Sequence, residues 1–128
     1  MVTVDNILKF EQYRHEFNTW KRTIDFFKQE NAFLKNRLSK VVDVKSDKFF
    51  LAKAEQYQNQ FIIQDEFMDE LKHDIHVLDE IIGNVENQLL STKKIETKRT
   101  KIHNEMQYLE KNFTSIKNDF NDYLLQNV

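Results

Sequence analysis

Apolar residues recur at alternating steps of three and four over most of the chain, and this spacing constrains the fold more than any other feature of the sequence. One run covers residues 10–41, a second covers 50–89 and a third covers 95–123. Residues at this spacing lie on one side of an α-helix and form the apolar seam of a coiled coil. The sequence therefore predicts three long amphipathic helices.

The expected helices extend over about 4–42, 47–82 and 85–126, within a single domain of residues 1–128. Ser46 is a suitable N-cap for the second helix, because its hydroxyl can accept a hydrogen bond from the first turn. The chain contains no proline. Three uninterrupted helices require this, because a proline inside a helix costs about 3 kcal/mol.

The end of the second helix is harder to place. The single glycine of the chain, Gly83, is followed by Asn84, and residues of these types commonly end helices. A turn there would set the acidic segment 65–80 beside the basic segment 93–101, with each exposed ion pair contributing ~0.2–1 kcal/mol. The expected pairs are Lys93 with Asp74, Lys98 with Asp69 and Lys101 with Glu66. We favour this turn, while a turn near residues 91–92 and one continuous long helix stay open as alternatives.

Composition agrees with an elongated fold. Hydrophobic residues make up 40% of the chain and charged residues 31%, which is more polar than a compact globule. The 11 Phe, 4 Tyr and 1 Trp are too many aromatic residues for a disordered chain. We expect an all-α fold, an elongated antiparallel up-down-up three-helix bundle that resembles a coiled coil and is about 55–65 Å long. Dimerisation would extend it into a larger bundle.

Several classes of protein are excluded by what the chain lacks. One glycine, no proline and no cysteine exclude glycine-rich phosphate-binding loops, nucleophile elbows, disulfide frameworks and thiolate zinc sites. We expect neither a catalytic residue nor a cofactor. No apolar run approaches the ~18 residues of a membrane-spanning helix, and no secretory signal is recognised, so we expect a cytoplasmic protein.

Two amides interrupt the apolar seams. Asn31 lies on the first seam and Gln64 on the second. A polar residue at such a position lowers stability but sets the register, because only one alignment satisfies its hydrogen bonds. A turn centred near residue 44 would put Asn31 opposite about Gln58, and Gln64 opposite about Asp25. The alternative is a buried polar site that lines a pocket.

Arg99 interrupts the third seam in the same way. With a turn at Gly83, Arg99 would lie within about one helical turn of Gln64 and near Asp65 and Asp69. We expect it to form a salt bridge at the edge of the seam.

One segment has the spacing of a metal-binding motif. Glu70 and His73 form an E-x-x-H, which di-iron bundles take from two helices, whereas this chain contains it once. Counting from the seam, His73 and the nearby His76 point away from the core. His73 follows Asp69 by four residues, so local ion pairing is enough to explain it. A metal-binding bundle that uses Glu70, His73 and His76 is the second functional hypothesis.

Charge gives little reason to expect nucleic-acid binding. The chain has 19 basic and 21 acidic residues, a formal net charge of −2, so there is no general attraction to nucleic acid or to anionic membranes. The basic segment Lys93–Lys101 has no aromatic residue among its lysines. Weak binding to nucleic acid or to an anionic surface through this segment is the third hypothesis.

Some apolar residues lie off the seams. Phe26 and Phe33 are seven residues apart in the first helix. The second helix adds a further line: Ile63, Phe67, Val77 and Ile81. Those that stay exposed together would form an association surface. The leading hypothesis is a non-enzymatic interaction or scaffold protein that binds itself, as a homodimer through the first two helices, or another helical protein. Phe26, Phe33 and Phe67 form the predicted contact surface.

Overall fold

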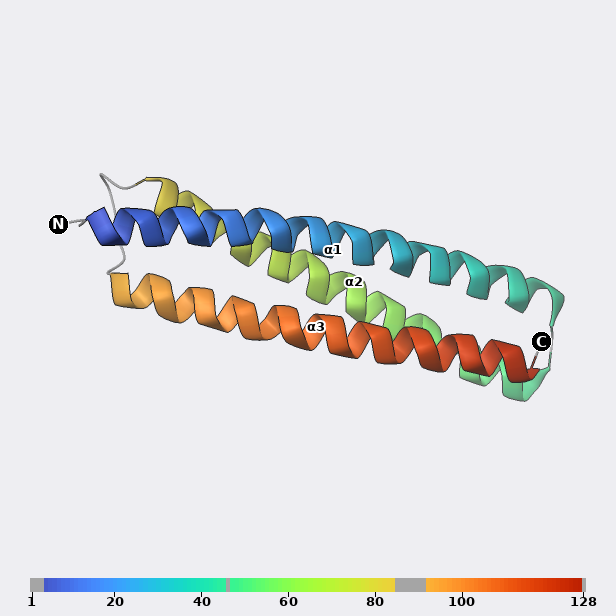
Figure 1. Ribbon diagram of the computed structural model, residues 1–128. Helices are drawn as coiled ribbons and strands as arrows, with labels where there is room; N and C mark the ends of the chain where they lie inside the picture. Colours follow the sequence, from blue (N-terminus) through green and yellow to red (C-terminus); the bar gives the residue numbers. More distant parts are fainter. Residues whose placement is uncertain (1–3, 46, 85–91, 128) are drawn as a thin grey trace.

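The computed structural model describes residues 4–45, 47–84 and 92–127, and these ranges form three long α-helices (Figure 1). Their bounds are α1 Val4–Val44, α2 Lys48–Gly83 and α3 Thr92–Asn127. α2 runs antiparallel to α1, and α3 runs antiparallel to α2, so α1 and α3 point the same way along the rod (Figure 1). Among these described helices, none has the length and apolar character needed to cross a membrane. The predicted all-α, antiparallel three-helix bundle is confirmed.

α2 begins at a cap that differs from the predicted one. The side chain of Asp47 accepts hydrogen bonds from the backbone N–H groups of Phe49, at 2.8 Å, and of Phe50, at 3.0 Å. Asp47 thus takes the role predicted for Ser46, which lies outside the described residues. A carboxylate here also interacts favourably with the positive end of the helix dipole, which a neutral hydroxyl does not.

α2 ends at Gly83, where the backbone N–H of Asn84 donates to the carbonyl oxygen of Glu80 at 3.1 Å. Because α3 is described from Thr92 and runs antiparallel to α2 (Figure 1), the alternative of one continuous long helix is excluded. The predicted start of the third helix at residue 85 lies outside the described residues.

The seam residues of all three helices fill the core. Phe17, Phe61, Phe113 and Phe120 are each 0% exposed. The ring of Phe120 meets Phe61 edge-on, with 5.1 Å between ring centroids, and meets Tyr57 edge-on at 5.2 Å. Aromatic pairs of this geometry contribute about 0.5–1.5 kcal/mol beyond the area that they bury, so α2 and α3 are joined by a cluster of aromatic rings.

The register between α2 and α3 differs from the one predicted from charge. The rings of Phe67 and Tyr108 pack edge-on with 5.7 Å between their centroids, whereas the predicted alignment puts Thr100 opposite Phe67. Within the described ranges, none of the three predicted α2–α3 ion pairs forms. The prediction is wrong because burying a large apolar side chain contributes ~1.5–3 kcal/mol, which exceeds an exposed ion pair at ~0.2–1 kcal/mol.

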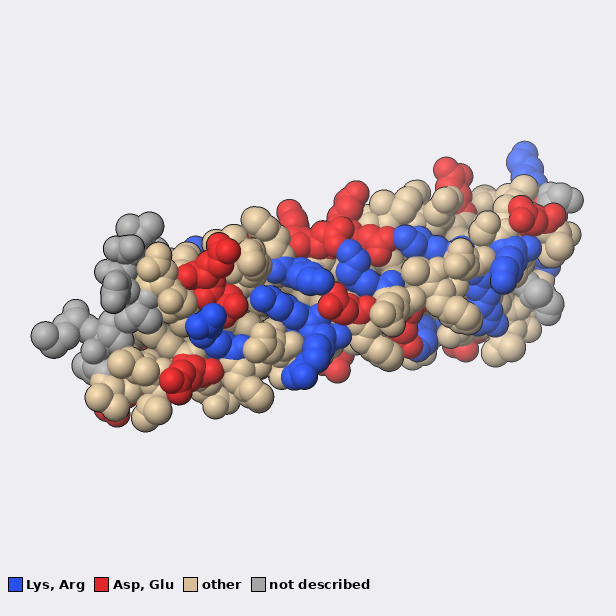
Figure 2. Space-filling view, turned by 90° about the horizontal axis from the view of Figure 1, so that it is seen from above, with Lys and Arg blue, Asp and Glu red and all other residues tan. Residues whose placement is uncertain are grey.

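Within the described ranges, every ion pair that joins two helices includes a residue of α1. One group joins α1 to α2: Lys35–Asp65, Lys28–Asp69, Lys72–Asp25, Arg14–Asp79 and Lys21–Asp79. A second group joins α1 to α3: Lys9–Glu96, Arg99–Glu16 and Lys117–Glu30. Figure 2, seen from the side of α1, shows basic and acidic side chains next to one another along the rod. Asp65, Asp69 and Asp79 of the acidic segment therefore pair with α1 and not with α3.

Candidate interaction faces

Asn31 is fully buried and joins α1 to α2. Its Nδ2 donates to the carbonyl oxygen of Phe61 at 2.9 Å and to Oδ1 of Asp65 at 2.8 Å. These partners lie about one to two helical turns further along α2 than Gln58, the predicted neighbour. Asp65 also pairs with Lys35, so the amide belongs to a small polar network that favours one alignment of α1 on α2.

Gln64 is also buried, at 4% exposure, but it is not bonded to Asn31. Its Oε1 accepts no hydrogen bond from the described part of the chain, and the same holds for Oδ1 of Asn31. A buried acceptor without a donor costs roughly 1–3 kcal/mol. Both amides therefore lower the stability of the core, as a seam position occupied by a polar residue predicts.

Arg99 forms the expected salt bridge, but with α1. Its guanidinium contacts both carboxylate oxygens of Glu16, with Nε donating to Oε1 at 3.2 Å, and it lies 5.3 Å from the centroid of the Tyr13 ring. The predicted partners, Asp65 and Asp69, pair with lysines of α1 instead. That part of the prediction is wrong because aromatic packing, and not charge, sets the register of α3 on α2.

Phe26 and Phe33 are exposed on the outer side of α1, at 57% and 65%. Residues at three-four spacing around them are exposed too, and we name this row the α1 face: Arg22, Phe26, Gln29, Phe33, Asn36 and Lys40. The row holds two cations and no carboxylate. At 1.5 Å per residue, it is about 27 Å long.

A hollow of about 280 Å³ between α1 and α3 borders the α1 face beside both phenylalanines. On its rim, Nη1 of Arg37 donates to Oδ1 of Asn121 at 2.8 Å, which is a neutral partner. Lys117, on the same rim, pairs with Glu30 at 2.8 Å. The uncompensated charge next to the α1 face is therefore positive.

The outer side of α2 carries exposed aliphatic residues in a row whose charged members are carboxylates, while Lys98 and Lys101 of α3 line the hollow beside Val77. Ile63 is 58% exposed and Val77 is 40% exposed. We name the exposed row at three-four spacing the α2 face: Ile63, Glu66, Glu70, His73, Val77 and Glu80. It holds three carboxylates and neither lysine nor arginine, and it is about 26 Å long.

Phe67 and Ile81, which belong to the predicted association surface, are only partly exposed because both pack against the core. Phe67 is covered by the ring of Tyr108 from α3. Phe67 lies at the α2–α3 side, whereas Phe26 and Phe33 border the α1–α3 hollow. The single surface predicted for Phe26, Phe33 and Phe67 is therefore divided in two by α3.

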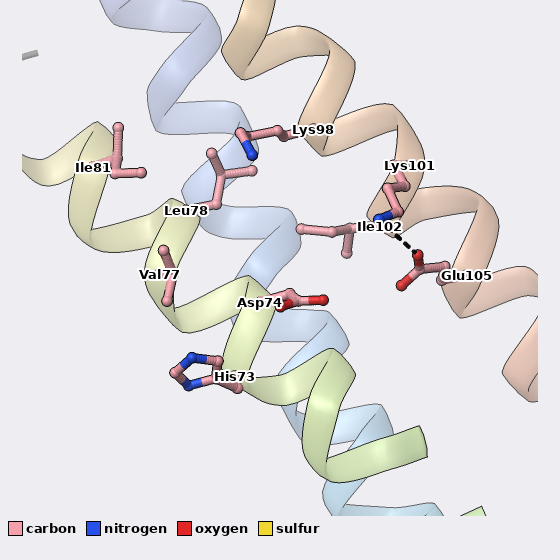
Figure 3. Close-up of a pocket in the computed structure, with 9 residues that line it drawn as sticks. All are labelled: His73, Asp74, Val77, Leu78, Ile81, Lys98, Lys101, Ile102 and Glu105. Atoms are coloured by element: carbon pink, nitrogen blue, oxygen red, sulfur yellow. Dashed lines mark ion pairs between the residues drawn. The ribbon is translucent and has the colours of Figure 1, made fainter. Parts of the chain in front are cut away.

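A second hollow, of about 300 Å³, lies between α2 and α3 (Figure 3). Its lining includes Val77 and Ile81 of α2, and Lys98 and Lys101 of α3. Lys101 lies 3.8 Å from a carboxylate oxygen of Glu105, one turn further along α3 (Figure 3). Arg99 of the basic segment 93–101 turns to α1 instead, whereas Lys98 and Lys101 face the α2–α3 hollow.

The histidines predicted to point outward do so. His73 and His76 are exposed, and Nε2 of His76 lies 3.1 Å from Oε1 of Glu80, in the next turn of α2. His73 is also among the residues that line the α2–α3 hollow (Figure 3). In the described part of the chain, no group of three or more His, Cys, Asp or Glu side chains is arranged to hold a metal ion.

Two apolar residues at helix edges were not predicted from the sequence. Ile62, which is 43% exposed, borders a hollow of about 430 Å³ between α1 and α2. Tyr108 covers Phe67, as described above. Each is the sequence neighbour of a seam residue, since Ile62 follows Phe61 and Tyr108 precedes Leu109. This placement alone does not identify them, because the exposed Phe33 and Phe49 also adjoin seam residues.

In comparisons with known proteins, no family model, no curated protein and no solved structure matches the chain. The function therefore has to be inferred from the fold and from the side chains that it exposes.

Proposed function

We propose that this protein is a non-enzymatic helical-bundle interaction protein that associates with itself and uses the α1 face to do so. The observation that supports the proposal is the exposure of Phe26 and Phe33, at 57% and 65%, one heptad apart on the same side of α1. Both lie beside a hollow that could receive side chains of a partner.

Exposed aromatic pairs of this kind are expensive to leave in water. Full burial of a phenylalanine side chain contributes about 1.5–3 kcal/mol. The core is filled by the seam residues, and both rings lie outside it. Apolar side chains grouped in this way mark surfaces that bind proteins, and a second helix is the partner that an exposed helix face fits best.

The test is the mass of the full chain in solution, measured by light scattering over a series of concentrations. Wild-type protein should have a mass above that of the monomer. The variant Phe26→Lys/Phe33→Lys should have the monomer mass and an unchanged helical circular dichroism spectrum, because both positions are outside the core.

A matched control is Ser115→Lys/Asn118→Lys, which adds the same two charges at exposed positions of α3 and should associate as the wild type does. A wild-type chain that stays monomeric at all concentrations would contradict the proposal. So would a Phe26→Lys/Phe33→Lys variant of unchanged mass.

A further inference from the structure

We infer that self-association is head-to-tail: the α1 face of one copy docks on the α2 face of the next. This inference rests on the proposed self-association and adds to it which surfaces meet. A pairing of two different faces differs in kind from a symmetric homodimer, in which the same patch of both copies is used.

Charge complementarity selects this pairing. The α1 face carries Arg22 and Lys40 without a carboxylate, and the α2 face carries Glu66 and Glu70 without lysine or arginine. Within the described ranges these four side chains form no ion pair, and Arg22 contacts only the hydroxyl of Thr19, at 3.5 Å. The charges are therefore available to a partner copy.

Symmetric pairings are opposed by the same charges. Two α1 faces packed on one another would bring two sets of cations together, and two α2 faces would bring together six carboxylates. Like charges in direct opposition are destabilising, and they discriminate against the wrong partner at an interface. In an antiparallel mixed pairing, Phe26 lies opposite Val77 and Arg22 lies beside Glu80. Lys40 then lies within about one helical turn of Glu66.

The two faces also have the same form. Each is a straight row on the outer side of one helix, which is the geometry for packing two helices side by side.

The position of the two faces makes the assembly open-ended. Phe33 borders the hollow between α1 and α3, whereas Val77 borders the hollow between α2 and α3. The faces thus lie on different sides of the bundle, so one neighbour cannot cover both. Each copy can bind one neighbour through each face, and heterologous contacts of this kind generate rings or filaments.

A mixing experiment tests the inference on the full chain. One variant, Phe26→Lys/Phe33→Lys, has only the α2 face intact, and a second, Ile63→Lys/Val77→Lys, has only the α1 face intact. Each variant alone should have the monomer mass. A 1:1 mixture should reach twice the monomer mass and no more, because the one remaining interface joins a single pair.

Each other outcome is informative. If Ile63→Lys/Val77→Lys alone associates as the wild type does, the α2 face is not used. The head-to-tail inference is then wrong, while self-association stands. If the mixture stays monomeric, the two faces do not bind one another, and the inference is again overturned. If the wild type itself is monomeric, both the inference and the proposed function are wrong.

A charge exchange gives a second readout that does not depend on the apolar residues. Arg22→Glu/Lys40→Glu and Glu66→Lys/Glu70→Lys should each reduce association at least tenfold in low salt, and the chain with all four changes should recover it. If Glu66→Lys/Glu70→Lys associates as the wild type does, these charges do not select the pairing. The same follows if the fourfold variant does not recover association. All four positions are exposed, and circular dichroism checks that the helices are retained.

Discussion

The interface of α2 with α1 and the interface of α2 with α3 are built differently, although all three helices have the same seam spacing. α1 and α2 are joined along their edges by ion pairs, among them those of Lys28 and Lys35 with α2 aspartates. α2 and α3 share no ion pair within the described ranges and are joined by rings, such as Phe61 with Phe120. One helix can therefore use charge toward one neighbour and aromatic packing toward the other.

The lysines toward α2 recur at the heptad spacing, at positions 21, 28 and 35. A repeated cation on one edge of α1 meets aspartates on the facing edge of α2, which favours this alignment over those that bring like charges together. The α2–α3 edge has Phe67 and Tyr108 in the corresponding place, so shape rather than charge sets the alignment there.

The largest expected effect breaks the aromatic interface. Phe61→Ala should lower the free energy of unfolding by about 3–5 kcal/mol, because it opens a cavity at a fully buried position between α2 and α3. Denaturant unfolding followed by circular dichroism measures this. Phe49→Ala is the control: Phe49 is 86% exposed, and the change should stay within about 0.5 kcal/mol. A loss of under about 1 kcal/mol for Phe61→Ala would contradict the structure.

A smaller effect is expected at the ionic interface, and it should depend on salt. Lys28→Glu/Lys35→Glu should lower the free energy of unfolding by about 1–2 kcal/mol in low salt, since two attractive pairs become repulsive. The loss should shrink in 1 M NaCl, where charges are screened within about 3 Å. Adding Asp69→Lys should restore part of it. The loss from Phe61→Ala should show no such salt dependence, and equal salt dependence would remove the distinction between the interfaces.

The two buried amides, Asn31 and Gln64, are the next positions to replace. Gln64→Leu should raise the free energy of unfolding by about 1 kcal/mol, because it replaces a buried acceptor that has no donor with an apolar group. Asn31→Leu should raise it less, since it also removes the two hydrogen bonds to α2. The same unfolding experiment measures both. A Gln64→Leu protein less stable than wild type would show that the amide is satisfied in solution.

The smallest expected effect concerns alkaline pH. Burial, together with the nearby carboxylate of Asp119, raises the pKa of Tyr57 above its ordinary value of 10.0, and its hydroxyl donates to the carbonyl oxygen of Asp119 at 3.2 Å. The unfolded chain therefore ionises first, so this contribution is present below about pH 10 and is lost as pH rises further.

Tyr57→Phe should consequently reduce the loss of stability between pH 9 and pH 11 by less than about 1 kcal/mol. Tyr108→Phe is the control, because the Tyr108 side chain is 58% exposed. An identical pH profile for wild type and Tyr57→Phe would contradict the assignment.

The helices were predictable and their alignment was not, for a physical reason. A side chain such as Phe17 or Ile24 is assigned to the core by its spacing from its own neighbours along the chain, and both are buried. The alignment of two helices depends on groups that are distant in sequence. A heptad pattern shifted by seven residues looks almost the same, so Arg99 was assigned partners on α2 although its carboxylate lies on α1.

The candidate faces were predictable in part. The exposure of Phe26 and Phe33 follows from their place off the seam of α1. Phe67 has the same kind of place on α2 but is covered by Tyr108, whose position depends on the alignment of α3. Whether an off-seam residue is exposed is therefore decided by the neighbouring helix.

Within the described ranges, α1 takes part in every ion pair that joins two helices. This has a consequence for how the chain folds during synthesis. α1 leaves the ribosome before either helix that it pairs with. When α2 follows, Lys28 and Lys35 are already present to receive its aspartates, and a helical hairpin of such local contacts forms quickly. The aromatic rings of α2 stay exposed to water until α3 has been made. Between the synthesis of α2 and that of α3, rings such as Phe61 and Tyr57 therefore lack the cover that Phe120 gives them, and exposed apolar surface of this kind makes a nascent chain prone to aggregate.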